Sequence, residues 1–242
     1  MLPAGVPLLE ETIALAKEWR TAPELDGTEP RKADEICREK AQEAQKLGEP
    51  ESGNTAESLE SCVALGEAWE ADFLLLKLDG DGRIRLHGGC VCFPSSWRLT
   101  EKMGRPLEEI HDPVPTLNAS LAPSIASFLS RLRPGPAWLR SNWGMARTPE
   151  LNLHPDRQMP RLTLPLEAGE VWVRIENQAL VLLPQSRGIL FGIRLEILSL
   201  AKVKSQPAAA RGLHRALRTM PESIAEYKGL AAARGELLRM LE

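Results

Sequence analysis

The order of the strand-like segments is the feature of this sequence that most restricts its fold. Residues 72–93 are typical of a β-hairpin, because two apolar runs flank the turn sequence Asp-Gly-Asp-Gly. Further strands are predicted at 133–145, 161–166, 170–184 and 188–200. Strands and helices do not alternate regularly in this order, which favours antiparallel pairing. We therefore expect an α+β fold, with an antiparallel sheet covered on one face by short helices.

Two short helices are expected directly after the hairpin. Serines at the start of 95–103 are suited to cap a first helix, and Pro106 is suited to the first turn of a second. Pro113 is expected to force Asp112 out of the helical region. The second helix would then end at His111, with that side chain on the apolar face of the helix.

Amphipathic spacing predicts further helices in the chain. They are expected at 7–20, 31–47, 58–69, 121–132, 208–220 and 222–241. This arrangement predicts an N-terminal helical extension (1–70), a sheet domain (71–204) and C-terminal helices that pack on the domain (205–242).

Charge and composition exclude several classes of partner. The formal net charge is −3 and the sequence pI about 5.9, so no nucleic-acid partner is expected. The start of the chain lacks the basic region of a signal peptide, and no run approaches the roughly 20 apolar residues of a membrane span. The four cysteines do not suit a disulfide scaffold, so reduced thiols are expected. We therefore expect a cytoplasmic protein without a membrane partner.

Most standard catalytic and metal-binding motifs are absent from the sequence. It contains no P-loop, no dinucleotide-binding glycine pattern, no HExxH, no GxSxG and no CxxCH. Cys90 and Cys92 have no second pair at zinc spacing, and Asp-Gly-Asp-Gly lacks the spaced acids of a calcium loop. The remaining candidates for metal binding are the histidines.

His111 differs from the other three histidines, which are all explained as surface residues. It lies on an apolar helix face, and prolines at 113 and 115 fix the backbone after it. One interpretation is a core histidine hydrogen-bonded to a carbonyl. The other is a single axial ligand, because haem iron can be held by one histidine in an apolar pocket. The residues alone leave both interpretations open.

A haem pocket would also need flat side chains and cations for the propionate groups. Candidates for these roles are Trp97, Trp143, Arg98, Arg105, Arg174 and Arg194. Strand alternation explains several of them equally well as ordinary surface residues.

Several motifs resemble the bacterial haem-dependent oxidative N-demethylase family. They are VCFPSSW (91–97), EKMGRPLEEIHDPVP (101–115), SNWG (141–144), VRIENQALVLLP (173–184), ILFGIR (189–194) and MPESIAEYKG (220–229). The most specific part is CFPSxW followed by GRPLxxIHxPVP, because spacing and rare residues agree together. The resemblance implies a PAS-like fold for the sheet domain.

The resemblance also implies an activity and a cofactor. It implies oxygen activation at haem b and oxidative N-demethylation of a small secondary or tertiary methylamine, with release of formaldehyde. Electrons would come from NADPH through separate flavin and iron–sulfur partner subunits. His111 would then be the iron ligand, with Trp97, Arg105, Trp143, Arg174 and Arg194 around the cofactor.

The implied chemistry requires a polar group near the iron and a carboxylate that holds an ammonium ion. Glu176, Gln178 and Asn142 are the candidates, and a polar row on the sheet surface is the alternative explanation. Two positions depart from the family pattern: Asn177 stands where the family has Arg, and Gly144 where Ser is common. A non-catalytic PAS-like haem or small-ligand sensor, and an interaction protein that has lost the pocket, therefore remain as alternatives.

Overall fold

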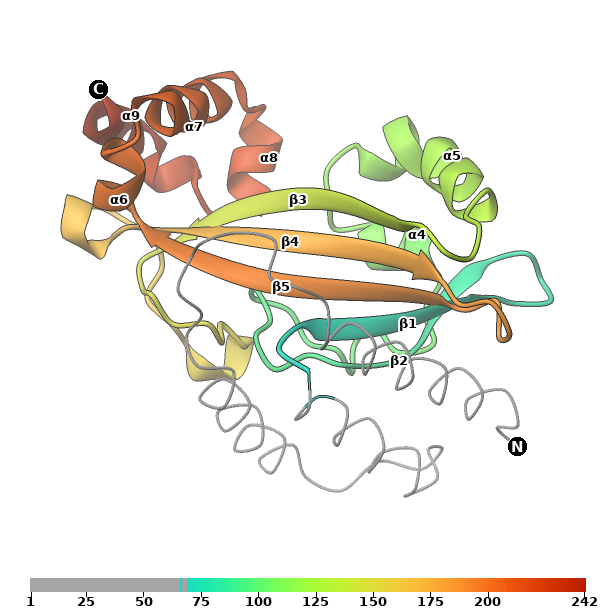
Figure 1. The fold of residues 1–242 in the computed structure, drawn as a ribbon. Coiled ribbons are helices and arrows are strands. Elements are labelled where there is room, and N and C mark those ends of the chain that lie inside the picture. Colours follow the sequence, from blue (N-terminus) through green and yellow to red (C-terminus); the bar gives the residue numbers. More distant parts are fainter. Residues whose placement is uncertain (1–65, 67–68) are drawn as a thin grey trace.

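An antiparallel sheet forms the centre of the structure (Figure 1). The computed structural model describes residue 66 and residues 69–242, and in this part the sheet has the order β2-β1-β5-β4-β3. Its strands are β1 (Asp72–Leu78), β2 (Ile84–Cys90), β3 (Ala137–Ala146), β4 (Trp172–Leu182) and β5 (Ile189–Ser199). The predicted α+β class and antiparallel pairing are confirmed. The helices predicted at 7–20 and 31–47, and nearly all of that at 58–69, lie outside the described residues.

The first two strands form the predicted hairpin. Asp79 N donates to Arg83 O at 2.9 Å, and the turn includes Gly82 with a positive φ of 80°. The Asp79 carboxylate pairs with Arg85 at 3.0 Å, so it neutralises a cation of the same hairpin. Gly89 allows a close approach of the strands, because a Cβ there would lie 2.5 Å from Phe73 O. A plain hairpin turn is therefore what this sequence encodes.

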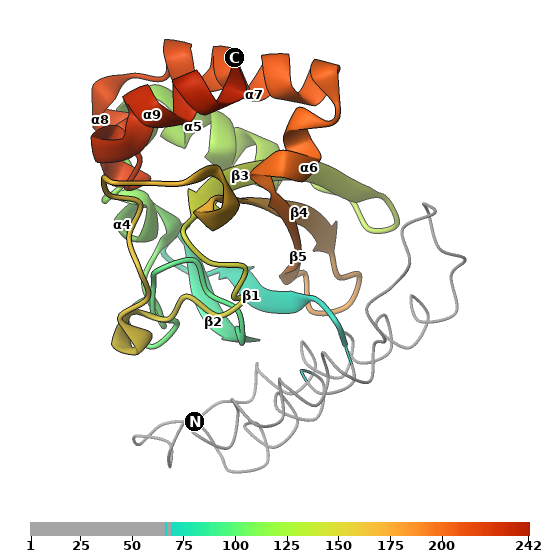
Figure 2. The same ribbon diagram turned by 90° about the vertical axis from the view of Figure 1, so that its left-hand side faces the viewer.

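One face of the sheet, called the inner face below, carries α4 (Leu107–His111) and α5 (Leu117–Ser130). Figure 2 shows α4, the segment that precedes it and the loop between β3 and β4 together on one side of the sheet. A core of Leu76, Leu86, Leu129, Leu132, Leu182 and Ile189 joins α5 to the strands. Burial of this apolar surface stabilises the layer by about 25 cal/mol per Å².

The chain around α4 differs from the sequence prediction in two respects. No helix forms over 95–103, where bends and turns replace it, and Lys102 N and Met103 N both bond to Leu99 O. Asp112 keeps helical angles (φ −53°, ψ −37°) although Pro113 follows it. The proline bias against helical angles is only a preference, and the contacts around α4 overcome it. His111 is nevertheless the last residue of α4, as predicted.

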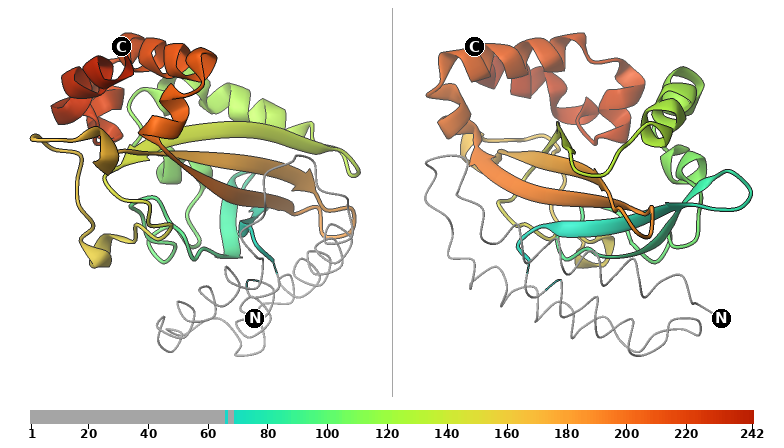
Figure 3. Two further views of the ribbon diagram at one scale, coloured as in Figure 1. Left: turned by 60° about the vertical axis from the view of Figure 1, so that its left-hand side comes forward. Right: turned by 45° about the vertical axis from the view of Figure 1, so that its right-hand side comes forward.

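The opposite face of the sheet, called the outer face, is covered at one end by the C-terminal helices. These are α6 (Leu200–Lys204), α7 (Pro207–Thr219), α8 (Glu222–Tyr227), η3 (Ala231–Ala233) and α9 (Arg234–Leu241). Val171, Val173 and Met145 share a core with Leu217 and Leu237 of α7 and α9. Figures 1 and 3 show these helices and α5 over opposite ends of β3.

The loop between β3 and β4 does not contain the strand predicted at 161–166. This loop contains η1 (Pro155–Arg157) and η2 (Ala168–Glu170), but residues 161–166 have no strand partner. Arg147 binds Thr163 O at 3.2 Å and Pro165 O at 3.0 Å, while Leu162 and Leu166 are buried beneath the C-terminal helices. The alternation of leucines therefore anchors a loop rather than a strand.

A buried guanidinium closes this loop over the inner face. Arg174, only 3% exposed, donates to Glu150 O at 2.7 Å and to Leu151 O at 2.8 Å. It also donates to Ser95 Oγ at 3.4 Å, so it joins the loop to the segment that follows β2. A bridge between Ser95 and Leu153 completes the connection. Arg174 therefore fixes two irregular segments against β4.

No helix in the described part of the chain is long and apolar enough to cross a lipid bilayer.

Replacement of Arg174 by Met should destabilise the fold, because it removes the charged donor of two partly buried hydrogen bonds to the carbonyls of Glu150 and Leu151. We expect the free energy of unfolding in urea to fall by about 2–4 kcal/mol. Arg211→Met, at an exposed position of α7, is the matched control and should change stability by less than about 0.5 kcal/mol. Equal stability of the two variants would contradict the structural role of Arg174.

Candidate functional site

A carboxylate held by three donors is the centre of the candidate site. Glu176 lies on the inner face of β4, directly opposite Asn142 of β3. Its carboxylate accepts hydrogen bonds from Asn142 Nδ2 at 3.2 Å, Gln178 Nε2 at 2.9 Å and Ser95 Oγ at 3.0 Å. The structure thus brings the three predicted polar residues together, and it adds Ser95. Because three hydrogen bonds engage its two carboxylate oxygens, the orientation of the Glu176 side chain is fixed.

Gln178 connects this carboxylate to an arginine on the neighbouring strand. Gln178 is 5% exposed and pairs with Arg140, whose Nε donates to Gln178 Oε1 at 2.6 Å. The same amide donates its Nε2 to Glu176. Because its oxygen accepts from a cation, the orientation of the Gln178 amide is determined. Arg140, Gln178, Glu176, Asn142 and Ser95 are called the polar row below.

Arg174 supports the polar row from the next inner-face position of β4. Burial lowers the pKa of Arg174 to about 10, although the carboxylates of Glu176 and Asp72 act in the opposite direction. The guanidinium is therefore still charged at neutral pH. Its Nη1 and Nη2 bind backbone carbonyls and Ser95, while its buried Nε has no partner in the described residues, so it acts as a structural cation of the inner face.

Lys228 reaches the polar row from the end of α8, a contact that sequence reasoning missed. Its Nζ donates to Trp143 O at 2.6 Å and to Asn142 Oδ1 at 3.4 Å, and it lies 5.5 Å from the centre of the Trp143 ring. Burial lowers the pKa of Lys228, and the nearby Glu176 opposes this effect. The only signal in the sequence was the family-like segment that contains Lys228, which assigned it no role.

Tyr227 lies next to Lys228 and also interacts electrostatically with Glu176. Burial raises the pKa of the Tyr227 hydroxyl, and the negative charge of Glu176 raises it further. Tyr227 is therefore a neutral phenol near the polar row at neutral pH.

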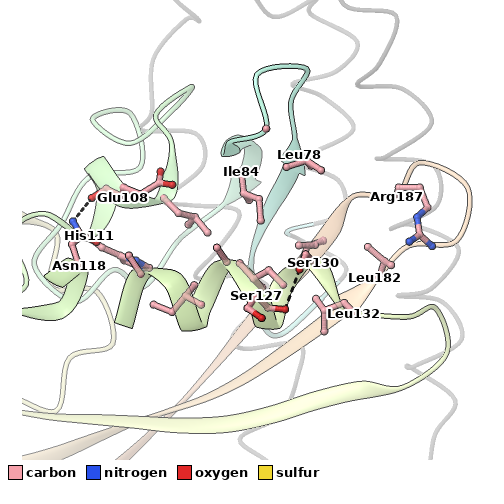
Figure 4. A pocket seen from close by; sticks show the side chains of 17 residues that line it. Leu78, Ile84, Glu108, His111, Asn118, Ser127, Ser130, Leu132, Leu182 and Arg187 are labelled. Atoms are coloured by element: carbon pink, nitrogen blue, oxygen red, sulfur yellow. Dashed lines mark hydrogen bonds between the residues drawn. The ribbon is translucent and has the colours of Figure 1, made fainter. Parts of the chain in front are cut away.

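An apolar cavity of about 500 Å³ lies on the inner face between the hairpin, α4 and α5, and no residue of the polar row lines it. Its walls include Ile84, Leu107, Ile125, Leu182 and Ile189, and His111 lies at one end (Figure 4). This volume is in the range of small-molecule and cofactor pockets. The structure therefore places His111 on the wall of a ligand-sized apolar space.

The imidazole of His111 is held in its neutral form. Burial lowers the pKa of His111 from 6.5, and the positive charge of Arg140 lowers it further. Glu108 has an opposing but smaller effect. Among the residues of the polar row, Arg140 is the one whose charge acts on His111. A neutral imidazole has a free nitrogen lone pair, which is the form that binds a metal.

Four other predicted cofactor residues lie apart from His111 or make no contact with it. Trp143 packs with the C-terminal helices on the outer face, and Arg194 is also on that face, with Nε 3.1 Å from Glu70 Oε1. Arg105 is exposed beside α4, and Trp97 is half-buried in the segment after β2. None of these four side chains lines the cavity that contains His111.

The described residues contain no group of three or more His, Cys, Asp or Glu side chains that could hold a metal ion. A metal bound directly by the protein therefore has no ligand set in this part of the chain. A metal that brings its own equatorial ligands needs only one protein ligand, and His111 offers one.

A comparison with known protein families identifies the family of this chain. The model of the family described as haem-dependent oxidative N-demethylase, alpha subunit-like, matches residues 32–238. The match covers most of the chain, including every element of the polar row and the cavity. The protein belongs to this family.

The cavity fits the haem that the family description implies. Haem iron takes its four equatorial ligands from the porphyrin, so the protein supplies an axial ligand and an apolar pocket. His111 is a neutral imidazole at such a pocket, and the walls carry branched aliphatic side chains. Asn118 supports this part of the wall, because its Nδ2 donates to Glu108 O at 2.7 Å.

The depressed pKa of His111 predicts a pH dependence of stability in the haem-free protein. The unfolded imidazole binds a proton near pH 6.5 and the folded one only at lower pH. The free energy of unfolding should therefore fall as the pH falls below about 6.5, and this part of the decline should vanish in His111→Gln. Urea titrations between about pH 5 and about pH 8 measure it. His214→Gln is the control, and an unchanged profile in His111→Gln would contradict the prediction.

Proposed function

We propose that this protein binds haem b in the inner-face cavity, with His111 as the axial iron ligand, and oxidatively demethylates a small secondary or tertiary methylamine. The observation that carries the proposal is the neutral His111 on the wall of an apolar cavity, on the face of the sheet that also holds the polar groups around Glu176. Membership of the haem-dependent N-demethylase-like family supports it.

When bound, haem would supply the activation of molecular oxygen, which protein side chains do not provide. The protein would contribute one imidazole and the aliphatic walls of the cavity, which exclude water. In the net reaction, the N-methyl carbon is oxidised and leaves as formaldehyde, with one oxygen atom from O₂. The second oxygen atom becomes water, with two electrons and two protons from outside the site.

Glu176 is suited to hold the substrate as an ammonium ion. Its carboxylate is half-buried and fixed by three neutral donors, so it does not need to reorganise when a cation binds. Hydrogen bonds between a charged amine and a carboxylate are roughly twice as strong as neutral ones. Asn142 and Gln178 would fix the position of Glu176, and their amides complete the polar surface around the amine.

The two departures from the family pattern lie on opposite faces of the sheet. Asn177 is exposed on the outer face, where its Oδ1 accepts from Ser141 Oγ at 3.1 Å. Gly144 is on the inner face beside Arg174, and a side chain there would meet open space. The outer-face position of Asn177 removes one argument for a non-catalytic haem or small-ligand sensor, whereas Gly144 leaves the inner face without the hydroxyl of the family's Ser.

Electrons would come from NADPH through flavin and iron–sulfur partner subunits. The description of the family as alpha subunit-like implies that other subunits exist. A reductase chain of this kind, together with reduced thiols, is consistent with a cytoplasmic protein. Cys90 and Cys92 form no disulfide with each other, and their sulfur atoms lie 3.7 Å apart.

The iron–histidine bond is tested by the absorbance spectrum during haem titration. We expect the wild type to give a saturable Soret band, and His111→Ala to give a weaker and shifted band because it lacks the axial ligand. His214→Ala, on α7, is the matched control and should behave as the wild type. Identical spectra for His111→Ala and the wild type would remove His111 from the proposal.

The role of Glu176 is tested by the isosteric variant Glu176→Gln. Loss of the negative charge should weaken binding of dimethylamine by about 10- to 100-fold, the value of a charged hydrogen bond. Formaldehyde release and the spectral change of the haem protein at increasing amine concentration measure this effect. Glu196→Gln, exposed on β5, is the control. Equal amine affinity in both variants would contradict the assignment.

A further inference from the structure

The cavity that His111 lines shares three lining residues, at its far end, with a second hollow of different character. This hollow has a volume of about 610 Å³. Its lining residues are Ser130, Arg131, Leu132, Arg133, Pro134 and Arg187. Three of them, Ser130, Leu132 and Arg187, line the apolar cavity as well. Figure 4 shows Arg187 at the opposite end of the cavity from His111. An apolar space thus leads into a basic one where α5 ends.

The three arginines of this hollow have no carboxylate partner in residues 69–242, and no acidic residue lines the hollow. All three are exposed. Only Arg131 makes a side-chain hydrogen bond, from Nε to Ser127 O at 2.9 Å, and this bond holds it against α5. Some other arginines near the surface do form ion pairs, as Arg83 does with Glu109 and Arg157 with Glu150. The charge of the hollow is therefore not neutralised by the described chain.

Arg187 occupies a backbone conformation that favours glycine. It lies in the turn between β4 and β5 and has a φ of 57°, in the left-handed region. Folding alone would be served better by glycine, because a Cβ atom destabilises this conformation. The side chain at this position is thus a candidate for ligand binding rather than for the stability of the turn.

The joined spaces define the chemistry of their ligand. It must have an apolar body for the cavity and anionic groups at one end for the arginines. A haem has both, since its propionate carboxylates extend from one edge of an apolar macrocycle. Arginine is suited to this role because its planar fork binds carboxylates with two parallel hydrogen bonds.

We propose that Arg187, together with Arg131 and Arg133, binds the propionate carboxylates of the cofactor. This assignment rests on the proposed function. It replaces the sequence-based expectation of Arg105, Arg174 and Arg194, because Arg174 is engaged by backbone carbonyls and Arg194 lies on the outer face. Residues of α5 would then line the space for the cofactor, with His111 at one end to hold the iron and the arginines at the other to hold the carboxylates.

The test separates carboxylate binding from iron binding. Metal-free protoporphyrin IX carries the propionates but no iron, and its dimethyl ester has no charged carboxylates. Binding of both porphyrins to the full-length protein is measured by fluorescence titration. The variants are Arg187→Gly, the triple variant Arg131→Met/Arg133→Met/Arg187→Gly, and the control Arg211→Met. Thermal unfolding of each variant is measured in parallel.

We expect the triple variant to bind protoporphyrin IX at least about tenfold more weakly than the wild type, since charged hydrogen bonds are lost. The dimethyl ester should bind the wild type and the triple variant equally. Arg187→Gly should show weaker protoporphyrin binding with an unchanged or higher unfolding temperature, because glycine relieves the left-handed strain. If Arg187 had a purely structural role, Arg187→Gly would lower the unfolding temperature and leave protoporphyrin affinity unchanged.

Equal protoporphyrin affinity in the wild type and the triple variant would overturn the assignment. So would a wild type that binds haem with a Soret band dependent on His111 but does not bind protoporphyrin. In both cases the iron ligation by His111, tested separately, would stand. A third outcome is loss of protoporphyrin binding in the triple variant, with no effect of His111→Ala on the haem spectrum. It would support propionate binding by the arginines and reject His111 as the iron ligand.

Discussion

The buried guanidinium of Arg174 is the interaction on which the inner face of this protein depends. It holds the loop after β3 and the segment after β2 against β4. Both segments are irregular, so their carbonyl groups cannot be satisfied by the sheet. Ser95, which Arg174 contacts, is also a donor to Glu176. A structural cation and the candidate binding carboxylate thus share one hydroxyl, which couples loop closure to the geometry of the polar row.

The inner face divides into regions with different chemistry. The polar row extends along β3 and β4, the apolar cavity lies beneath α4 and α5, and the arginines lie beyond it at the turn after β4. His111 lines the apolar cavity, where burial and the charge of Arg140 lower its pKa and favour the neutral imidazole. This gradient suits a cofactor with an apolar macrocycle, one coordinating metal and an anionic edge, and it leaves the polar row for a small amine.

The sequence predicted correctly those features that depend on the spacing of residues within one strand or one helix. The alternation in β4 placed Glu176 and Gln178 on one face, and the spacing in α4 placed His111 at its end. The predicted strand at 161–166 was wrong, because Arg147 binds the carbonyls of this loop and its leucines are buried in the core beneath the C-terminal helices. The helix predicted at 95–103 was also wrong, since turns and bends replace it. Lys228 and Arg187 reach the site from segments distant in sequence. Only the tertiary structure brings them there.

The central claim is that this chain holds haem through a single histidine. Its most direct measurement is the absorbance spectrum of freshly purified full-length protein, before and after stoichiometric addition of haem. The account predicts a Soret band that saturates at one haem per chain and shifts when a ligand such as imidazole or cyanide competes for the iron. A spectrum that remains the sum of free haem and protein at every ratio would contradict it.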